Sequence, residues 1–303
     1  MQSKLIVLSL VHTIIANVHS FLLPTNGRRP LTTRIENASH DAEALKTQLF
    51  QKIDLLRAIQ ALDGTTPTSI EYGVKGGELD PKTRAPQKVN FYGISDATGV
   101  VADDITSICH QLAAFNPTTE ATHAWGTPQA AEDCPLHGPW KLLFSTAADA
   151  AFSKNSKRGD AIIRNEVDAV NGWMSNIIDF IPGANAKNKP GLIEQLLVKI
   201  KATALNPQRV ALEFRYAKIT FRRFFFVPKR WSLYIPVPAT FLTRLLVWTS
   251  RLLRRKSGPK PPKAFFDVLY LDPDVRIHQT GEDNLFVQAR PDSSRAKGLL
   301  RSM

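Results

Sequence analysis

Charged side chains that could do acid–base chemistry gather near the C-terminal end of this sequence. Within residues 265–290 they are Asp272, Asp274, Arg276 and Glu282. Paired carboxylates can act as a general acid and a general base, and an arginine can hold a substrate beside them. A second pair of carboxylates is Asp168 and Asp179. Both sets also have a structural interpretation, which we favour: Asp272 shapes a turn through its side chain, and Arg276 pairs across strands.

An enzyme also needs a nucleophile or a poised acid and base, and the sequence contains no arrangement that supplies one. It has no G-x-S-x-G, P-loop, G-x-G-x-x-G or H-E-x-x-H motif. Cys109 and Cys134 lack both the C-x-x-C spacing and a ligand-like spacing to the seven histidines, which argues against zinc. The sequence therefore predicts no catalytic residue, no metal and no cofactor. A disulfide between the two cysteines stays open.

The elements that position the C-terminal charges are short antiparallel strands. Apolar and polar residues alternate through residues 265–290, on both sides of two turn-forming segments. A strand of the same kind begins at Gly138 and places Trp140, Leu142 and Phe144 on one face. These two stretches predict the closing and the opening strands of one β unit.

Further strands are predicted between them. Residues 165–180 contain Asn171-Gly172, the dipeptide that supplies both positive-φ residues of a type I′ hairpin. Residues 196–204 and 210–217 alternate in the same way on either side of a turn. A meander leaves its edges exposed unless it closes, and a closed barrel of about eight strands has room inside for side chains or one small ligand. The predicted fold is mainly β, an antiparallel β-barrel.

A helical region is predicted ahead of the strands. Residues 41–62 place leucine and isoleucine at helical spacing, with acidic residues at the start and Gly64 as the stop. Residues 103–115 predict a second, shorter helix that ends before Pro117, and residues 118–135 are predicted to be irregular. The helices should form an N-terminal subdomain packed against the barrel.

The first residues have the features of targeting sequences. Lys4 precedes an apolar run at residues 5–16, which is too short to span a bilayer. A site like those cut by signal peptidase follows the run, so the segment predicts a signal peptide. The alternative is a buried helix. The next stretch begins at Phe21, is rich in arginine and threonine and has no acid before Glu36, which is typical of a transit peptide. A signal peptide followed by a transit peptide resembles the leaders of algae whose plastids derive from a red alga.

Three motifs follow one another along the chain. They consist of Gly138, Trp140, Leu142, Leu143 and Phe144, then Asp168, Gly172, Asn176 and Ile177, then Leu271, Asp272, Asp274, Arg276, Ile277, Gly281, Leu285, Phe286 and Val287. In this order and spacing they resemble the plastid lipid-associated protein family, also called the fibrillins or plastoglobulins. The resemblance covers residues 105–290. Two features depart from the family pattern: Pro139 precedes the tryptophan, and residues 224–263 are longer and more basic.

The resemblance implies a lipocalin-like barrel in a plastid protein of thylakoids or plastoglobules. It also implies a non-enzymatic role, either binding a hydrophobic carotenoid, prenylquinone or lipid, or coating thylakoid and plastoglobule surfaces. The alternative is an enzyme or a biosynthetic accessory acting on a lipophilic plastid metabolite. The candidate ligand-lining residues are Trp140, Leu142, Phe144, Leu212, Phe214, Tyr216, Tyr270 and Phe286, together with Leu285. Simple core packing is an equal interpretation of each residue, and the oligomeric state stays open.

The net charge of +12 is concentrated in one segment. Residues 215–263 contain thirteen lysines and arginines and no acidic residue. Within them, residues 239–256 predict a basic amphipathic helix that docks on an anionic plastid membrane; packing of that helix on the barrel is the alternative. The residues expected at the membrane surface are Arg244, Trp248, Arg251, Arg254 and Arg255. The aromatic and basic run at 221–226 is also compatible with single-stranded nucleic acid, the partner that we rank last.

These features define five segments along the chain. They are a signal peptide at 1–20, a transit peptide at 21–38, a helical region at 39–135, a fibrillin-type barrel at 136–291 with a basic insertion at 222–263, and a tail at 292–303. A hydrophobic content of 43% is enough for one substantial core, so the barrel and its helices are expected to form the folded part.

Overall fold

A computed structural model describes residues 31–63, 88–147, 161–182, 191–223, 230–236 and 264–293. The predicted signal peptide, the start of the predicted transit peptide and the predicted helix at 239–256 lie outside these residues, so they remain predictions. The chain divides into two compact units, Met1–Asp41 and Ala42–Met303. All strands belong to the second unit, and the description below concerns that unit.

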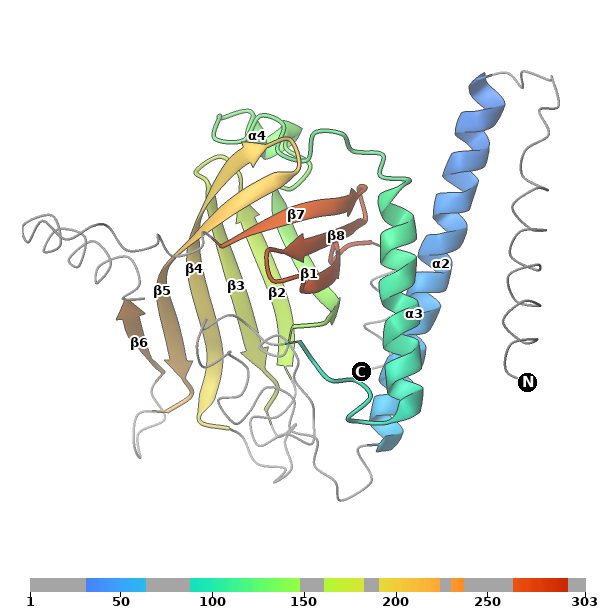
Figure 1. The fold of residues 1–303 in the computed structure, drawn as a ribbon. Helices are drawn as coiled ribbons and strands as arrows, with labels where there is room; N and C mark the ends of the chain where they lie inside the picture. The colour runs from blue at the N-terminus through green and yellow to red at the C-terminus, as the bar shows by residue number, and fades with distance from the viewer. Residues whose placement is uncertain are drawn as a thin grey trace, which may run out of the picture. The chain divides into compact units, whose positions relative to one another are not determined.

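Nine strands form one antiparallel sheet (Figure 1). They are β1 (Gly138–Ser145), β2 (Ala161–Asp168), β3 (Trp173–Phe180), β4 (Ile193–Asn206), β5 (Arg209–Phe221), β6 (Trp231–Pro236), β7 (Ala264–Leu271), β8 (Val275–Thr280) and β9 (Leu285–Ala289). Their order is β4-β3-β2-β1-β9-β8-β7-β5-β6, and an additional β4–β5 pairing closes the sheet in a ring. The prediction of a mainly β, barrel-like fold with helices is confirmed.

The two ends of this ring differ. At one end, residues 118–137 fold over the β2–β3 and β4–β5 loops, where Gly126 N donates to Ala169 O and Thr122 N donates to Pro207 O. This segment, predicted irregular, contains one short helix, α4 (Ala130–Asp133). Towards the other end β5 changes partners. Residues 209–212 of β5 pair with β7, whereas residues 216–221 of β5 pair with β6. In Figure 1, β2 to β5 extend at this end beyond β7 and β8.

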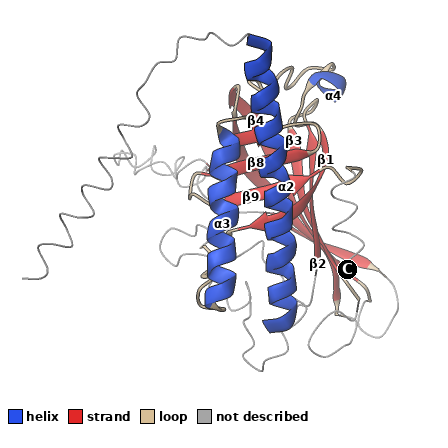
Figure 2. Cartoon of the chain, turned by 90° about the vertical axis from the view of Figure 1, so that its right-hand side faces the viewer, coloured by secondary structure: helices blue, strands red, loops and turns tan. Residues whose placement is uncertain are grey.

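Two helices cover part of the outer face of the ring. The helices are α2 (Leu31–Asp63) and α3 (Asp96–Ala113), and residues 42–63 of α2 lie beside α3 across β8 and β9 (Figure 2). Both are longer than predicted, and α3 begins earlier because Ser95 caps it by accepting a hydrogen bond from Thr98 N. Leucine and isoleucine side chains of both helices form one core with the outward-facing residues of β8 and β9. No helix in the described part of the chain is long and apolar enough to cross a membrane.

A second core fills the inside of the ring next to the covered end. It joins buried side chains of the strands to Ala121, Ala130 and Leu136 of the covering segment. Cys109 belongs to the helix-side core and Cys134 to the inner core, and both cysteines are free. The disulfide that the sequence left open is therefore not formed.

The β2–β3 hairpin differs from the predicted type I′ turn. Asp168 pairs with Trp173, so four residues rather than two form the loop. The Asp168 carboxylate accepts hydrogen bonds from Asn171 N and Asn171 Nδ2 at 3.0 and 2.9 Å, and only Gly172 has a positive φ, of 64°. A Cβ on Gly172 would lie 2.9 Å from Ala202 O. The prediction was wrong for Asn171 because the side chain of Asp168 provides the turn instead.

Candidate ligand-binding site

Residues paired directly across neighbouring strands share a face of the sheet. The inner face is identified by Trp140, Val167, Met174 and Ile200, which belong to the inner core and are at most 4% exposed. Following the pairings around the ring shows which of the predicted lining residues point inward. Trp140, Leu142, Leu212, Phe214 and Phe286 lie on this face.

Three predicted lining residues face the helices instead. The register of β1 shifts between Leu142 and Phe144, so Phe144 pairs with Val287 and stacks on Phe91, 5.8 Å between ring centroids. The register of β7 shifts between Val268 and Tyr270 in the same way, and Tyr270 joins the helix-side core. A bulge inserts one residue into a strand and therefore turns the following side chain to the other face. Leu285 also lies in the helix-side core.

A third bulge changes the face of Tyr216. Phe214 pairs with Ile200, but Tyr216 pairs with Lys199, so Arg215 is the extra residue. Tyr216 consequently lies on the outer face, where its ring contacts that of Tyr234. The expectation that Phe144, Tyr216 and Tyr270 point inward is wrong for this single reason.

The inner face at the end of the ring opposite residues 118–137 carries a row of aliphatic side chains. Successive pairings across β2, β3, β4, β5 and β6 join Ile163, Ile178, Leu196, Ile219 and Leu233. None of these five side chains is fully buried, and Leu233 is 41% exposed. Phe214, one row deeper than the pair Val198 and Ala217, is 38% exposed. The ring therefore presents apolar surface on its inner face that its own side chains do not cover.

The adjoining wall of the interior, one step deeper in the ring, is polar. Arg276 Nε donates to Gln288 Oε1 at 2.8 Å, and Arg276 Nη2 donates to Asn165 Oδ1 at 2.7 Å. Asn165 Nδ2 in turn donates to Asn176 Oδ1 at 2.6 Å. The Arg276 guanidinium also lies 4.9 Å from the centroid of the Trp140 ring. Arg276 is fully buried, whereas Asn176 is exposed, so this network leads from solvent into the interior.

Two nitrogen atoms of this wall are buried without a hydrogen-bond partner: Arg276 Nη1 and His278 Nδ1. Burial, together with the charge of Arg290, lowers the pKa of Arg276 well below its usual range. Because a guanidinium stays charged in proteins, the shift reflects the free-energy cost of burying the charged Arg276 side chain. Burial and the charge of Arg276 also lower the pKa of His278 well below its usual range. His278 is therefore neutral, and its ring stacks on Phe286.

Comparison with known proteins identifies the fold. Residues 90–289 match the PAP_fibrillin family, a span that includes α3 and every strand of the ring. The chain belongs to this family of plastid lipid-associated proteins. No curated protein and no solved structure matches it. Family membership associates the protein with plastids and lipids, and it gives no residue a role in binding a ligand.

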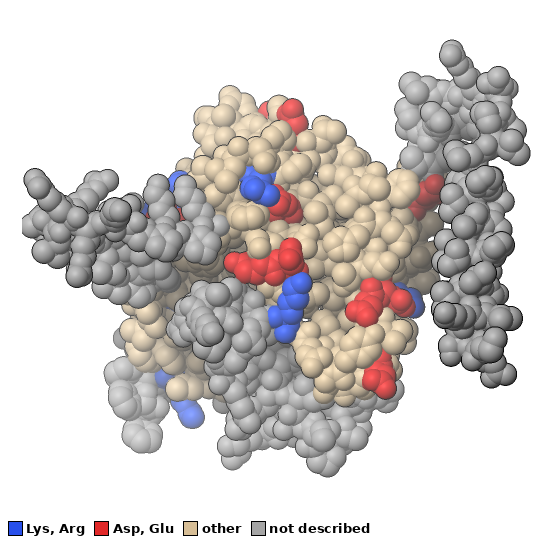
Figure 3. Space-filling view, viewed as in Figure 1, with Lys and Arg blue, Asp and Glu red and all other residues tan. Residues whose placement is uncertain are grey.

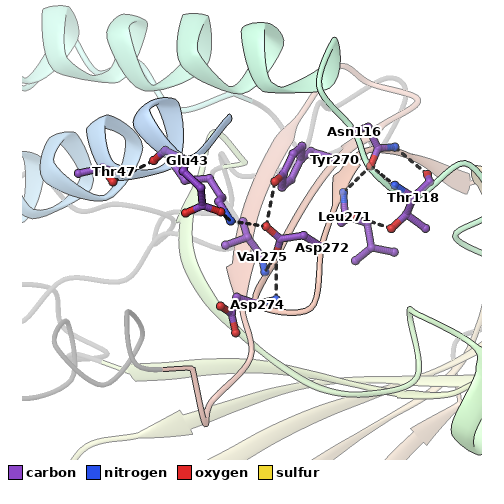
Figure 4. Close-up of polar contacts among 10 residues, drawn as sticks. Glu43, Thr47, Asn116, Thr118, Tyr270, Leu271, Asp272, Asp274 and Val275 are labelled. Carbon is purple, nitrogen blue, oxygen red and sulfur yellow. Dashed lines mark hydrogen bonds and ion pairs between the residues drawn. The ribbon is translucent and has the colours of Figure 1, made fainter. Parts of the chain in front are cut away.

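Asp272, the first carboxylate of the group in this fibrillin that resembled a catalytic site, is used structurally. Asp272 Oδ1 accepts hydrogen bonds from Asp274 N and Val275 N at 2.8 and 2.7 Å, which forms the β7–β8 turn. Asp272 Oδ2 accepts from Tyr270 Oη at 2.8 Å and from Lys46 Nζ of α2 at 2.6 Å (Figure 4). Burial alone would raise the pKa of Asp272, but these hydrogen bonds hold it below its usual value. Such a carboxylate is poorly suited to take up a proton at neutral pH.

The Lys46–Asp272 ion pair is the main contact that sequence inspection of this fibrillin missed. Both side chains are buried, at 8% and 6% exposed. Burial alone would lower the pKa of Lys46, but its hydrogen bonds to Asp272 and Glu43 raise the pKa above its usual value. Next to this pair, Asn116 Oδ1 accepts from Leu271 N and Thr118 Oγ1 donates to Leu271 O (Figure 4). The ion pair and these bonds attach α2 and the segment after α3 to the end of β7.

The second carboxylate pair of the fibrillin is separated by its partners. Asp168 bonds to Asn171 in the hairpin loop, whereas Asp179 accepts from Arg164 Nε at 3.0 Å. In the described residues no group of three His, Cys, Asp or Glu could hold a metal ion.

Among the motif glycines, Gly138 has φ of 99°, and a Cβ there would lie 2.9 Å from Arg290 Nη1; a Cβ on Gly281 would lie 2.9 Å from the Phe265 ring. These glycines allow close packing.

Proposed function

We propose that this protein is a non-enzymatic plastid fibrillin that holds a hydrophobic metabolite inside its ring of strands. The observation that carries the proposal is the incompletely buried aliphatic row on the inner face, from Ile163 on β2 to Leu233 on β6. A soluble protein rarely leaves contiguous apolar surface uncovered unless something binds there. Each Å² of apolar surface that a ligand covers contributes about 25 cal/mol of favourable free energy.

The chemistry of the interior favours binding over catalysis. The inner-face residues deeper in the ring than the aliphatic row are amides, an arginine, a neutral histidine and aromatic rings. Catalysis would require a nucleophile with a base in hydrogen-bond reach, or two carboxylates with different protonation states. Asp272, the strongest candidate, is held as a buried ion pair outside the ring. An isoprenoid or acyl chain therefore fits the site better than a substrate awaiting acid–base chemistry.

Replacing Phe214 by arginine should remove the co-purifying lipid without unfolding the protein. Phe214 is 38% exposed, so the change places a charge on the apolar surface while leaving the buried core intact. We expect the lipid recovered per mole of protein, measured by mass spectrometry of a solvent extract, to fall by about tenfold or more, which corresponds to 1.4 kcal/mol of lost affinity. Leu205→Arg is the control, because Leu205 is 56% exposed in β4 near the β4–β5 loop. A wild-type protein that extracts free of lipid would exclude the proposed function.

A second candidate function is attachment to an anionic plastid membrane. Lys and Arg of the described residues lie among Asp and Glu on the face drawn in Figure 3, whereas residues 215–263 contain thirteen basic residues and no acid. We propose that the amphipathic sequence at 239–256, which lies outside the described residues, binds the membrane surface. Each basic residue near an anionic surface contributes about 1 kcal/mol before screening by salt.

Liposome flotation tests this second candidate. A variant with Arg244, Arg251, Arg254 and Arg255 all changed to glutamine should lose most of its binding to anionic vesicles, because four charges act jointly. The wild-type protein should float with anionic but not neutral vesicles, and added salt should weaken its binding. Equal recovery on both vesicle types, or an unchanged variant, would show that these arginines do not bind membrane. Tighter binding to single-stranded nucleic acid would instead support the partner ranked last.

A further inference from the structure

Arg276 is a buried charge that no acidic side chain of the described residues neutralises. Its partners Gln288 and Asn165 are neutral amides, and no acidic side chain among the described residues pairs with it. Its Nη1 atom has no hydrogen-bond partner although it is buried. Burying a charge without a counter-ion costs several kcal/mol, and a purely apolar ligand would not offset that cost.

The polar wall is placed next to the aliphatic row. Asn165 and Asn176 pair directly, one step deeper in the ring than the pair Ile163 and Ile178. Asn176 is exposed and bonds to Asn165, which bonds to Arg276. A molecule lying along the aliphatic row would thus place the end that covers Ile163 next to Asn165 and the arginine network.

We propose that the ligand is a single-chain amphiphile with a carboxylate headgroup, whose chain covers the aliphatic row and whose carboxylate pairs with Arg276. This inference rests on the proposed lipid-binding function and adds the chemical class of the ligand. A singly charged headgroup matches one unpaired guanidinium, because the nearby Arg290 already donates to Pro135 O and Pro139 O. Arg276 Nη1 supplies the unused donors, and a charge-assisted hydrogen bond to a carboxylate is about twice as strong as a neutral one.

Gln288 allows a test that does not remove the arginine. Gln288 lies directly opposite Arg276 on β9, and Gln288→Glu changes one amide to a carboxylate of the same shape. The variant protein would contain the counter-ion that the ligand otherwise supplies. The headgroup preference should then disappear while the fold becomes more stable.

The experiment compares parinaric acid with its methyl ester, two fluorescent probes with the same chain. The wild-type protein should bind the acid at least tenfold more tightly than the ester. Gln288→Glu and Arg276→Met should reduce acid binding to the level of the ester and leave ester binding unchanged. Gln279→Glu, which adds the same charge to a side chain of β8 on the other face, should keep the preference.

The outcomes separate the two proposals. Equal affinities of the wild-type protein for acid and ester would overturn the headgroup assignment and leave the lipid-binding function intact. A folded Gln288→Glu variant that still prefers the acid would also overturn it. If neither probe binds, both the headgroup assignment and the proposed function fail.

Discussion

Replacing Lys46 by methionine should lower the free energy of unfolding by about 3–5 kcal/mol, because the change leaves Asp272 as a buried charge without its ion-pair partner. Chemical denaturation of the purified protein measures this loss. Lys52→Met is a matched control: Lys52 also belongs to α2 and lies 2.6 Å from Asp104, but these two side chains are 37% and 44% exposed. An exposed pair of this kind contributes about 0–1 kcal/mol. Equal losses in the two variants would show that the buried pair has no special importance.

The pH dependence of this pair follows from the two pKa shifts. The pKa of Asp272 is lowered in the folded protein, so its contribution is complete above the usual aspartate pKa and is lost as the pH falls through the lowered value. The pKa of Lys46 is raised, so its contribution is complete below the usual lysine pKa and is lost as the pH rises through the raised value. Between these limits the contribution of the intact ion pair to the stability of the wild-type protein should be independent of pH.

Replacing Trp140 by alanine should, as a separate single change, lower the free energy of unfolding by about 3–5 kcal/mol. Trp140 is fully buried, its Nε1 donates to Leu136 O at 2.9 Å, and its ring lies beside the guanidinium groups of Arg276 and Arg290. The variant would lose all three interactions and leave a cavity between the ring and the segment that covers it. Urea denaturation, with the midpoint and slope both fitted, gives the loss.

Trp231→Ala provides the comparison for Trp140. Trp231 stacks on Phe221 at 4.5 Å between ring centroids, but it lies near the end opposite residues 118–137 and is only partly buried. Its removal should therefore cost clearly less than removal of Trp140. A similar loss in both variants would contradict the view that the stability of the ring is concentrated at its covered end.

Much of the strand pattern could be predicted because alternation and turn residues are local signals. The strands on both sides of the Asp272 turn lie where the sequence predicts them, and the two helices include most of their predicted residues although both begin earlier than predicted. The faces of several side chains could not be predicted, because a bulge moves one residue out of register. For β1 and β7 a signal existed, since adjacent apolar residues, Leu142-Leu143 and Val268-Leu269, interrupt the alternation. For Arg215 in β5 we find no such signal.

The polar contacts of the candidate site were beyond prediction for a different reason. Asn165 and Arg276 are 111 positions apart in sequence, and Lys46 and Asp272 are 226 apart. A local pattern predicts which strand a residue belongs to, but only ring closure determines which strands become neighbours. Cross-strand pairing was expected for Arg276 from its place in β8. Its lack of an acidic partner emerged only from the three-dimensional arrangement.

Closure of the ring also affects how the protein is made. β1 joins β9, and Leu285 N donates to Thr146 Oγ1 across 139 residues. During synthesis, the edge of β1 that pairs with β9 therefore stays unpaired until nearly all other strands have been translated. Unpaired edges and long-range pairing make such intermediates slow to fold and prone to aggregation. This fibrillin is thus expected to depend on chaperones during its folding, more than its modest size would suggest.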